Sequence, residues 1–223
     1  LCREQGIEKF VLSSTSSVYG AADNQIDPSL SEGSKTYKQL HENLPTDRPI
    51  SPYAASKMAA EGLCYTYHHL YELDVTVFRF FTVFGPAGRP DMSIFRFIRW
   101  IEEGDPVVVY GDGTQSRDFT YVGDVARGVV AGLKPLGFET INLGSDHPVP
   151  LNTVISLLEE IMHKRANIDY QPTHPADIRA TWADVSTAKK VLDWTPEVSF
   201  EEGLAQSVKW YRDNRGWAQA VNL

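Results

Sequence analysis

The order of elements in the first eighty residues constrains the fold more than any other feature of this sequence. Residues 7–13 (IEKFVLS) and 75–82 (VTVFRFFT) are short apolar runs of the kind that form buried strands. Between them, Ser51 and Pro52 supply the N-cap and first turn of a helix that we expect to reach about residue 73. A strand, a helix and a second strand in this order indicate a parallel α/β sheet.

The rest of the chain predicts a more mixed set of elements. We expect a helix over 92–103, a strand over 107–110, an extended piece over 117–122, a helix capped by Asp124 and a strand over 140–143. Apolar residues from 151 to 162 recur at helical spacing, and Ser199 with Glu202 forms a capping box for a final helix. The polar stretch after Gly20 is long enough to predict a lid or an insertion.

The first residues look like the last turn of a helix that ends at Gly6. Because the sequence therefore begins in the middle of a fold, we expect that structure preceding the first strand is missing. With 223 residues, 42% of them hydrophobic and 22% charged, the chain has the composition of one globular domain, or of one domain and part of another.

Charge and cysteine content exclude several classes of protein. The formal net charge of -8 argues against a general nucleic-acid binder or a binder of anionic membranes, and no apolar run is long enough to span a bilayer. Any anionic ligand must therefore be held by a few local arginines. Cys2 and Cys64 give neither a disulfide framework nor a zinc pattern, so we expect no metal and a reducing, cytoplasmic location.

Tyr53 and Lys57 are the first candidates for chemistry. They lie one helical turn apart on the expected helix, so their side chains share a face. An ammonium beside a phenol favours the phenolate, the form that acts as a general base. A solvated helix pair without function explains the same spacing.

A run of hydroxyl side chains follows the first strand. Residues 13–20 (SSTSSVYG) lie at the carboxyl end of that strand, where open α/β sheets bind ligands. A hydroxyl there completes a tyrosine, lysine and serine or threonine site. Alternatively, the run is a turn whose hydroxyls bond their own backbone.

Three motifs in order, SSTSSVYG, SPYAASK and RFFTVFGPAGRPDMS, resemble the extended short-chain dehydrogenase/reductases of the NAD-dependent epimerase/dehydratase family that act on nucleotide sugars. The third motif is most similar to that of the UDP-glucuronate 4-epimerases. The resemblance continues through VVVYGDGTQSRDFTYVGDVARG and PADIRATWADVSTAKKVLDWTPEVSFEEGL and so covers nearly the whole chain.

The resemblance implies a fold, a cofactor and a set of site residues. The fold is a Rossmann-like parallel sheet, with its N-terminal half missing, and a smaller C-terminal α/β substrate domain. Residues 1–85 and roughly 116–147 would belong to the NAD-binding domain, and roughly 86–115 and 148–223 to the nucleotide-sugar domain. The implied contacts with NAD are made by Ser13, Tyr53, Lys57 and Phe80, and those with a UDP-sugar by Ser16, Thr82, Arg89, Met92, Ser93, Tyr110, Arg117 and Asp177.

The resemblance also assigns roles to the catalytic set. Tyr53 would take the proton of the sugar 4-hydroxyl while hydride leaves C4 for the nicotinamide, Lys57 would bind the nicotinamide ribose, and Thr15 would hydrogen-bond the same sugar oxygen. Tyr110 would lie near the uracil and Arg117 would contact the diphosphate, a pairing that suits a guanidinium.

Two sequence features indicate which of this family's reactions and substrates to expect. Dehydratases carry acidic residues directly after the active-site threonine, and this chain has Ser16 and Ser17, whose hydroxyls are poor acids and bases. The remaining reaction is oxidation to a 4-keto sugar, rotation of that intermediate and its reduction. This sequence of steps is a C4 epimerisation. Arg89, with Thr82 and Ser16, matches a carboxylate-binding set and so favours UDP-glucuronate over UDP-glucose.

The sequence differs from the family pattern at several positions. The glycine-rich turn that binds the NAD pyrophosphate is absent from the sequence, so we expect the chain alone to bind NAD poorly. Residues 37–43 look inserted near the mouth of the active site, and Ala87 replaces a common aromatic residue.

The sequence is also compatible with other functions. They are a UDP-glucose 4-epimerase, a UDP-sugar decarboxylase or dehydratase, and a non-catalytic homologue that binds nucleotide sugars. The family resemblance also implies a homodimer paired through the helix after Tyr53, where Leu63, Tyr67 and Leu70 offer apolar surface; a buried core explains those three residues equally well.

Overall fold

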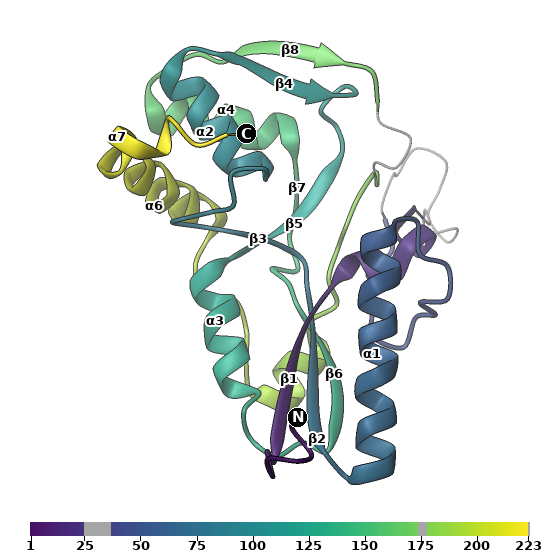
Figure 1. The fold of residues 1–223 in the computed structure, drawn as a ribbon. Helices are drawn as coiled ribbons and strands as arrows, with labels where there is room; N and C mark the ends of the chain where they lie inside the picture. The colour runs from purple at the N-terminus through teal and green to yellow at the C-terminus, as the bar shows by residue number, and fades with distance from the viewer. Residues whose placement is uncertain (25–36, 174–177, 223) are drawn as a thin grey trace.

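The parallel sheet predicted from the strand, helix and strand order is present. The computed structural model describes residues 1–24, 37–173 and 178–222. Strand β1 (Lys9–Thr15) pairs in parallel with β2 (Asp74–Phe80), which pairs in parallel with β6 (Phe138–Leu143). Figure 1 shows this sheet in one lobe of an elongated molecule, with α1 on one side and α3 on the other.

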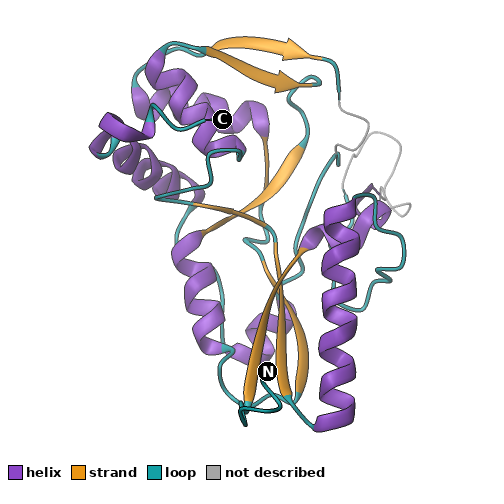
Figure 2. Ribbon diagram, in the orientation of Figure 1, coloured by secondary structure: helices purple, strands orange, loops and turns teal. Residues whose placement is uncertain are grey.

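Helix α1 (Pro52–Tyr71) forms where local sequence signals predict it. The Ser51 side chain accepts a hydrogen bond from the backbone N–H of Ala54, and Pro52 occupies the first helical position. The helix ends at Glu72, which adopts a left-handed conformation with φ 55°. It runs along the sheet and is followed directly by β2, so its first turn lies at the carboxyl end of the parallel strands (Figure 2).

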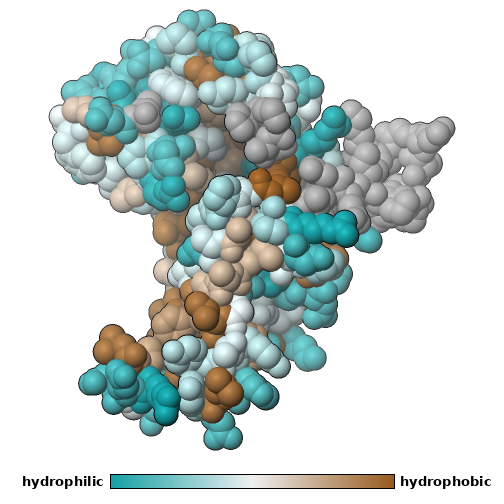
Figure 3. Space-filling model, turned by 45° about the vertical axis from the view of Figure 1, so that its right-hand side comes forward, coloured by the Kyte–Doolittle hydropathy of each residue, from teal (hydrophilic) through white to brown (hydrophobic). Residues whose placement is uncertain are grey.

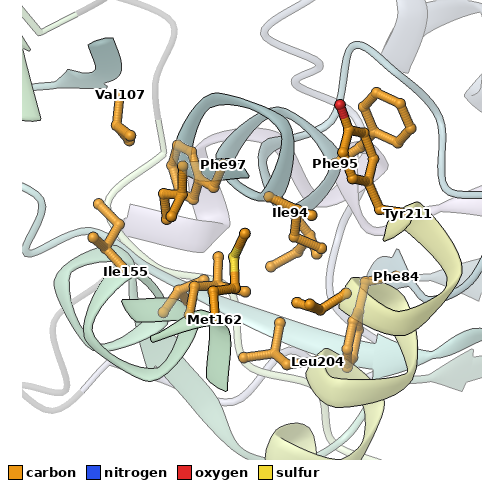
Figure 4. Packing of buried hydrophobic residues seen from close by; sticks show 14 of the residues in the cluster. Phe84, Ile94, Phe95, Phe97, Val107, Ile155, Met162, Leu204 and Tyr211 are labelled. Atoms are coloured by element: carbon orange, nitrogen blue, oxygen red, sulfur yellow. The ribbon is translucent and has the colours of Figure 1, made fainter. Parts of the chain in front are cut away.

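A second lobe holds most of the C-terminal helices. Its elements are α2 (Ser93–Glu103), β4 (Pro106–Tyr110), α4 (Leu151–Met162), β8 (Asn167–Gln171), α6 (Phe200–Asp213) and α7 (Arg215–Ala218). Strands β4 and β8 pair in parallel, and the three longest helices pack around a shared apolar core (Figure 4). That core includes Phe95 and Tyr211, whose ring centroids lie 5.8 Å apart.

Short strands connect the two lobes. Strand β3 (Thr82–Phe84) pairs in parallel with β5 (Ser116–Tyr121), which pairs antiparallel with β7 (Pro148–Pro150). Helices α3 (Val122–Ala131) and α5 (Ser186–Leu192) belong to the first lobe, where Phe78 and Trp194 are buried in a separate apolar core.

Residues 37–44, which include the segment expected to be an insertion, are tied into the core of the protein. Leu40 is 1% exposed and forms a bridge with Ala183. Its carbonyl accepts a hydrogen bond of 2.8 Å from Nδ2 of Asn142, and the Glu42 carboxylate accepts one of 2.8 Å from the backbone N–H of the same asparagine. The segment therefore joins β6 to the chain around residue 183.

Two expectations about local elements are wrong. The strand expected over 75–82 is divided, because β2 ends at Phe80 and β3 begins at Thr82. Asp124 does not cap α3, which begins at Val122; its buried carboxylate instead accepts hydrogen bonds from the backbone N–H groups of Glu197 and Val198.

The described residues contain neither a membrane-spanning helix nor a cluster of metal ligands. No helix among them is long and apolar enough to cross a membrane. Nor do the His, Cys, Asp and Glu side chains described here gather into a group of three or more that could hold a metal ion.

Candidate active site at the carboxyl end of the parallel sheet

Lys57 links the first turns of α1 to the end of β1. Its Nζ donates a hydrogen bond of 2.8 Å to the backbone carbonyl of Ser13 and lies 6.0 Å from the centroid of the Tyr53 ring. Tyr53 is 53% exposed, so its phenol is accessible to a ligand. The fold thus brings together three of the residues that the sequence selects.

The hydroxyl groups that follow β1 form the next part of the site. Thr15 is buried and lies opposite Phe80 in the β1–β2 register. Its Oγ1 donates to Oγ of Ser17 and accepts from the backbone N–H of Ser17, both at 3.2 Å. Ser16 is also buried, in the 3-10 helix η1 (Ser16–Asn24). Hydroxyls, and no carboxylates, therefore occupy positions 15–17.

The carboxylate of Glu61 lies between α1 and the sheet, and its hydrogen-bond partners are side chains of the protein. Glu61, one helical turn beyond Lys57, accepts hydrogen bonds from Ser14 Oγ and from Arg79, whose Nε and Nη2 lie 3.2 and 2.7 Å from its two oxygens. The side chains of Arg79 and Glu61 are 7% and 12% exposed. Burial lowers the pKa of Arg79, but the hydrogen bonds from its guanidinium to Glu61 raise it overall. We infer that this pair holds α1 against the sheet.

Arg89 lies in a pocket at the junction of the lobes. The same pocket is lined by Thr82, Met92 and Ser93, so four of the residues predicted to bind substrate meet there. Nε and Nη2 of Arg89 donate to the Asp91 carboxylate at 3.1 and 2.5 Å. These bonds raise the pKa of Arg89, and the nearby Tyr53 phenol adds a smaller electrostatic effect in the same direction.

A second pocket adjoins the first at Ser93. It is lined by Tyr110 and Arg117, the two residues predicted to lie near the uracil and the diphosphate. Tyr110 is 48% exposed, and Arg117 Nη1 donates a hydrogen bond of 2.8 Å to the carbonyl of Ser116. The two pockets share Ser93 as a lining residue.

Asp177, also predicted to bind substrate, lies outside the described residues.

Sequence reasoning missed two groups of residues in this region. Arg96 and Gln115 line the second pocket, and Glu61 with Arg79 supports the catalytic helix. Arg96 follows Ser93 by three residues on α2, a spacing that places two side chains on one helix face and that could have identified it. Glu61 stands in the same relation to Lys57, four residues further on.

A tyrosine and lysine pair at the carboxyl end of parallel strands, beside pockets lined by arginines, defines an α/β protein suited to an anionic ligand at the edge of its sheet. The sequence model of the NAD dependent epimerase/dehydratase family matches residues 1–144, and the chain belongs to this family.

Individual relatives are similar over nearly the whole chain. A UDP-glucuronate 4-epimerase of Thermodesulfobacterium geofontis is 53% identical over 215 residues, which are 96% of this chain and 62% of that protein. The crystal structure of UDP-glucuronic acid 4-epimerase from Bacillus cereus, in complex with UDP-glucuronic acid and NAD, matches with a TM-score of 0.84 and 36% identity over 96% of this chain and 64% of that one. The UDP-glucose 4-epimerase from Thermotoga maritima matches with a TM-score of 0.82 and 29% identity, covering 96% and 66%. The chain thus spans less than two thirds of the length of the first of these relatives.

Proposed function

We propose that the protein catalyses NAD-dependent C4 epimerisation of a UDP-sugar, converting UDP-glucuronate to UDP-galacturonate. The observation that carries the proposal is the position of Arg89, which lines one pocket together with Thr82 and Ser93. A base for a sugar hydroxyl and a guanidinium for a neighbouring carboxylate are the two groups that this substrate needs. The name of the relative at 53% identity supports the same substrate.

The residues at the end of β1 fit the nicotinamide end of NAD. Ser13, Tyr53, Lys57 and Phe80 would hold it: the Lys57 ammonium is fixed at Ser13 with donors to spare for ribose hydroxyls, and Phe80 lies beside Thr15. When bound, NAD supplies a hydride acceptor at C4 of the sugar and returns the hydride to the opposite face. The lobe built on β1, β2 and β6 would be the NAD-binding domain, and the lobe around α2, α4 and α6 would bind the nucleotide sugar.

The side chains of this protein would move and hold the proton. Tyr53 takes the proton of the 4-hydroxyl when C4 is oxidised and returns it when the keto group is reduced. Lys57 stabilises the phenolate by its positive charge, and Thr15 hydrogen-bonds the sugar oxygen. No acidic side chain occupies positions 15–17 to protonate a leaving hydroxyl, which favours epimerisation over dehydration.

The carboxylate of the substrate would be held by Arg89, Thr82 and Ser16. A 4-keto uronic acid is a β-keto acid and tends to lose carbon dioxide, so the grip on the carboxylate must disfavour that cleavage. Arg89 presents a bidentate fork that now engages Asp91, and a substrate carboxylate would compete for or share that fork.

The Asp91 pair also favours a second candidate, a UDP-glucose 4-epimerase. A guanidinium already neutralised by Asp91 accepts a neutral sugar without an uncompensated charge. The residues that line the second pocket, Tyr110 and Arg117, would contact the UDP part, which both sugars share.

Product analysis by NMR separates the two candidates. Purified protein is incubated with UDP-glucuronate and, separately, with UDP-glucose, at an NAD concentration high enough to offset the poor NAD binding expected of this chain. The proposal expects conversion of UDP-glucuronate to UDP-galacturonate, with UDP-glucose unchanged. Interconversion of UDP-glucose and UDP-galactose without any change in UDP-glucuronate would establish the second candidate instead.

We also propose that the protein forms a homodimer through the exposed face of α1. Leu63, Tyr67 and Leu70 are 62%, 46% and 58% exposed, which excludes a buried core as their explanation within the described residues. Figure 3, which brings the α1 side toward the viewer, shows brown apolar patches among polar side chains on the lobe that contains α1.

Cys2 and Cys64 are free thiols, and the cytoplasmic location expected from them stays a prediction.

A further inference from the structure

Arg96 places a second guanidinium in the pocket that contains Arg117. It lies on α2, three residues after Ser93, and lines this pocket together with Arg117, Tyr110 and Gln115. None of the motifs that point to a nucleotide sugar assigns a role to Arg96.

The environment of Arg96 leaves hydrogen-bonding capacity for a ligand. Its guanidinium carbon lies 5.6 Å from the centroid of the Trp100 ring, a contact that orients the side chain without using its donors. Its Nε is buried and has no hydrogen-bond partner among the residues that the structure describes. A buried donor without a partner is unfavourable, so a group that accepts a hydrogen bond there would be stabilising.

The local charge favours an anion with more than one negative charge. Arg89, Arg96 and Arg117 line two adjoining pockets, and Asp91, which pairs with Arg89, is the acidic residue lining the second one. Arg96 also acts on Asp91. The pKa of Asp91 is lowered chiefly by hydrogen bonds from Arg89, and the positive charge of Arg96 makes a smaller electrostatic contribution. In a chain of net charge -8, this concentration of positive charge is local.

We propose that Arg96 is a second residue that binds the diphosphate of a nucleoside diphosphate, beside Arg117, to which the family resemblance already gives that contact, and that Arg96 selects a diphosphate over a monophosphate. The inference rests on the proposed function, since it concerns the nucleotide end of the same substrate. Two planar guanidinium groups on one pocket suit the oxygen atoms of two linked phosphoryl groups.

Calorimetric titration of the purified chain with UDP, UMP and uridine tests the assignment. Arg96→Gln keeps two of the three methylenes and removes the charge, and we expect it to weaken UDP binding about tenfold or more, as loss of a charge-assisted hydrogen bond does. Binding of UMP should weaken less, and binding of uridine should not change. Arg96→Lys, which retains the charge without the fork, should recover part of the UDP affinity.

Arg99→Gln is the matched control. Arg99 lies on the same helix, but its Nη1 donates to the carbonyl of Val221 and it does not line the pocket. The control should bind all three ligands as the unsubstituted protein does.

Several results would overturn the assignment. They are unchanged UDP affinity in Arg96→Gln, an equal loss of uridine binding, an equal loss in Arg99→Gln, and no UDP binding by the unsubstituted protein. UDP binding that depends on Arg96, with no turnover of UDP-glucuronate, would preserve the diphosphate site and remove the proposed function.

Discussion

Tyr53 and Lys57 lie near the carboxyl end of β1, where the proposed reaction would need a base and a supporting cation. Because Tyr53 is the proposed acceptor of the sugar proton, Tyr53→Phe should lower kcat for UDP-glucuronate by about 10²–10⁴-fold, the range typical of a general base. UDP affinity should remain within about twofold, since in the proposed reaction the phenol contacts the sugar, which UDP lacks. The measurement is a product assay by NMR alongside calorimetric titration with UDP.

Tyr71→Phe provides the control for that substitution. Tyr71 is the last residue of α1, at the opposite end from Tyr53, and stacks with Arg3 at 4.2 Å. It should retain full activity. If Tyr53→Phe turned over UDP-glucuronate at the normal rate, another group would have to be the base.

In the proposed reaction, Arg89 selects a sugar that carries a carboxylate. Arg89→Gln should lower kcat/KM for UDP-glucuronate by about 10–100-fold, because a charge-assisted hydrogen bond to the carboxylate is lost. The fraction of decarboxylated product should rise as the grip on the carboxylate is lost. Arg48→Gln removes an exposed guanidinium that pairs with Asp47 and should change neither quantity. An equal loss of kcat/KM with UDP-glucose would contradict a role in recognising the carboxylate.

At the scale of the elements, α1 is fixed to the sheet by a buried ion pair. Glu61 joins α1 to Ser14 on β1 and to Arg79 on β2, so the two strands and the helix share one carboxylate. Glu61→Gln would leave the Arg79 charge without its partner in a buried position. We expect the free energy of unfolding to fall by about 3–5 kcal/mol, measured by urea denaturation.

Glu8→Gln, at an exposed glutamate before β1, is the comparison for this loss and should change stability by less than about 0.5 kcal/mol. A stability of Glu61→Gln within that margin would show that the ion pair does not hold α1 in place.

The opposite ends of the same strands carry a pH-dependent contact. Asp74 accepts hydrogen bonds from Lys9 and, at 2.8 Å each, from the backbone N–H groups of Leu136 and Gly137. Burial raises the pKa of Asp74, but these hydrogen bonds lower it overall. A lowered folded-state pKa means that the carboxylate stabilises the fold above its unfolded pKa of about 3.9, and that this stabilisation is lost as pH falls through the folded value.

Asp74→Asn should therefore reduce the free energy of unfolding by about 1–3 kcal/mol at pH 7, and the difference from the unsubstituted protein should narrow below about pH 4. Thermal unfolding followed by circular dichroism at several pH values measures both effects. Asp213→Asn, which removes an exposed ion pair with Lys209, should have little effect at any pH. A difference for Asp74→Asn that stayed constant down to pH 3 would contradict the assignment.

Elements that local signals define could be predicted from the sequence. The start of α1 follows from Ser51 and Pro52, and the last long helix begins where Ser199 accepts a hydrogen bond from the N–H of Glu202 at 3.1 Å. The role of Asp124 could not be predicted, because its carboxylate accepts hydrogen bonds from backbone more than 70 residues later in the chain, and no local pattern reveals such a contact. The break between β2 and β3 likewise follows from a change of pairing partner, from β6 to β5.

At the scale of the whole molecule, the family motifs predicted which residues meet, and the geometry adds those that support them. Ser13 and Lys57 are in contact, and Thr82 and Arg89 share a pocket, although each pair comes from separate elements. The buried position of Leu40 could not be predicted, because it depends on Asn142 and Ala183, and its own segment has no regular pattern. Long-range pairing of this kind is visible only in three dimensions.

The exposed face of α1 makes a prediction about assembly. Burying Leu63 and Leu70 against a second copy would remove apolar surface from water, at about 25 cal/mol per Å². Introducing a charge at each position should therefore abolish association, because two like charges would face each other without solvent. Sedimentation velocity should find a dimer for the unsubstituted protein and a monomer for the double variant Leu63→Glu, Leu70→Glu.

Leu133→Glu tests whether any exposed leucine would give the same result. Leu133 is 55% exposed and follows α3, on the other side of the sheet from α1, so a charge there should leave the dimer intact. Circular dichroism must show that the double variant retains the helix content of the unsubstituted protein, so that the monomer is not an unfolded chain. A dimer that survives both charges on α1, or dissociates with Leu133→Glu alone, would place the interface on another face of the molecule.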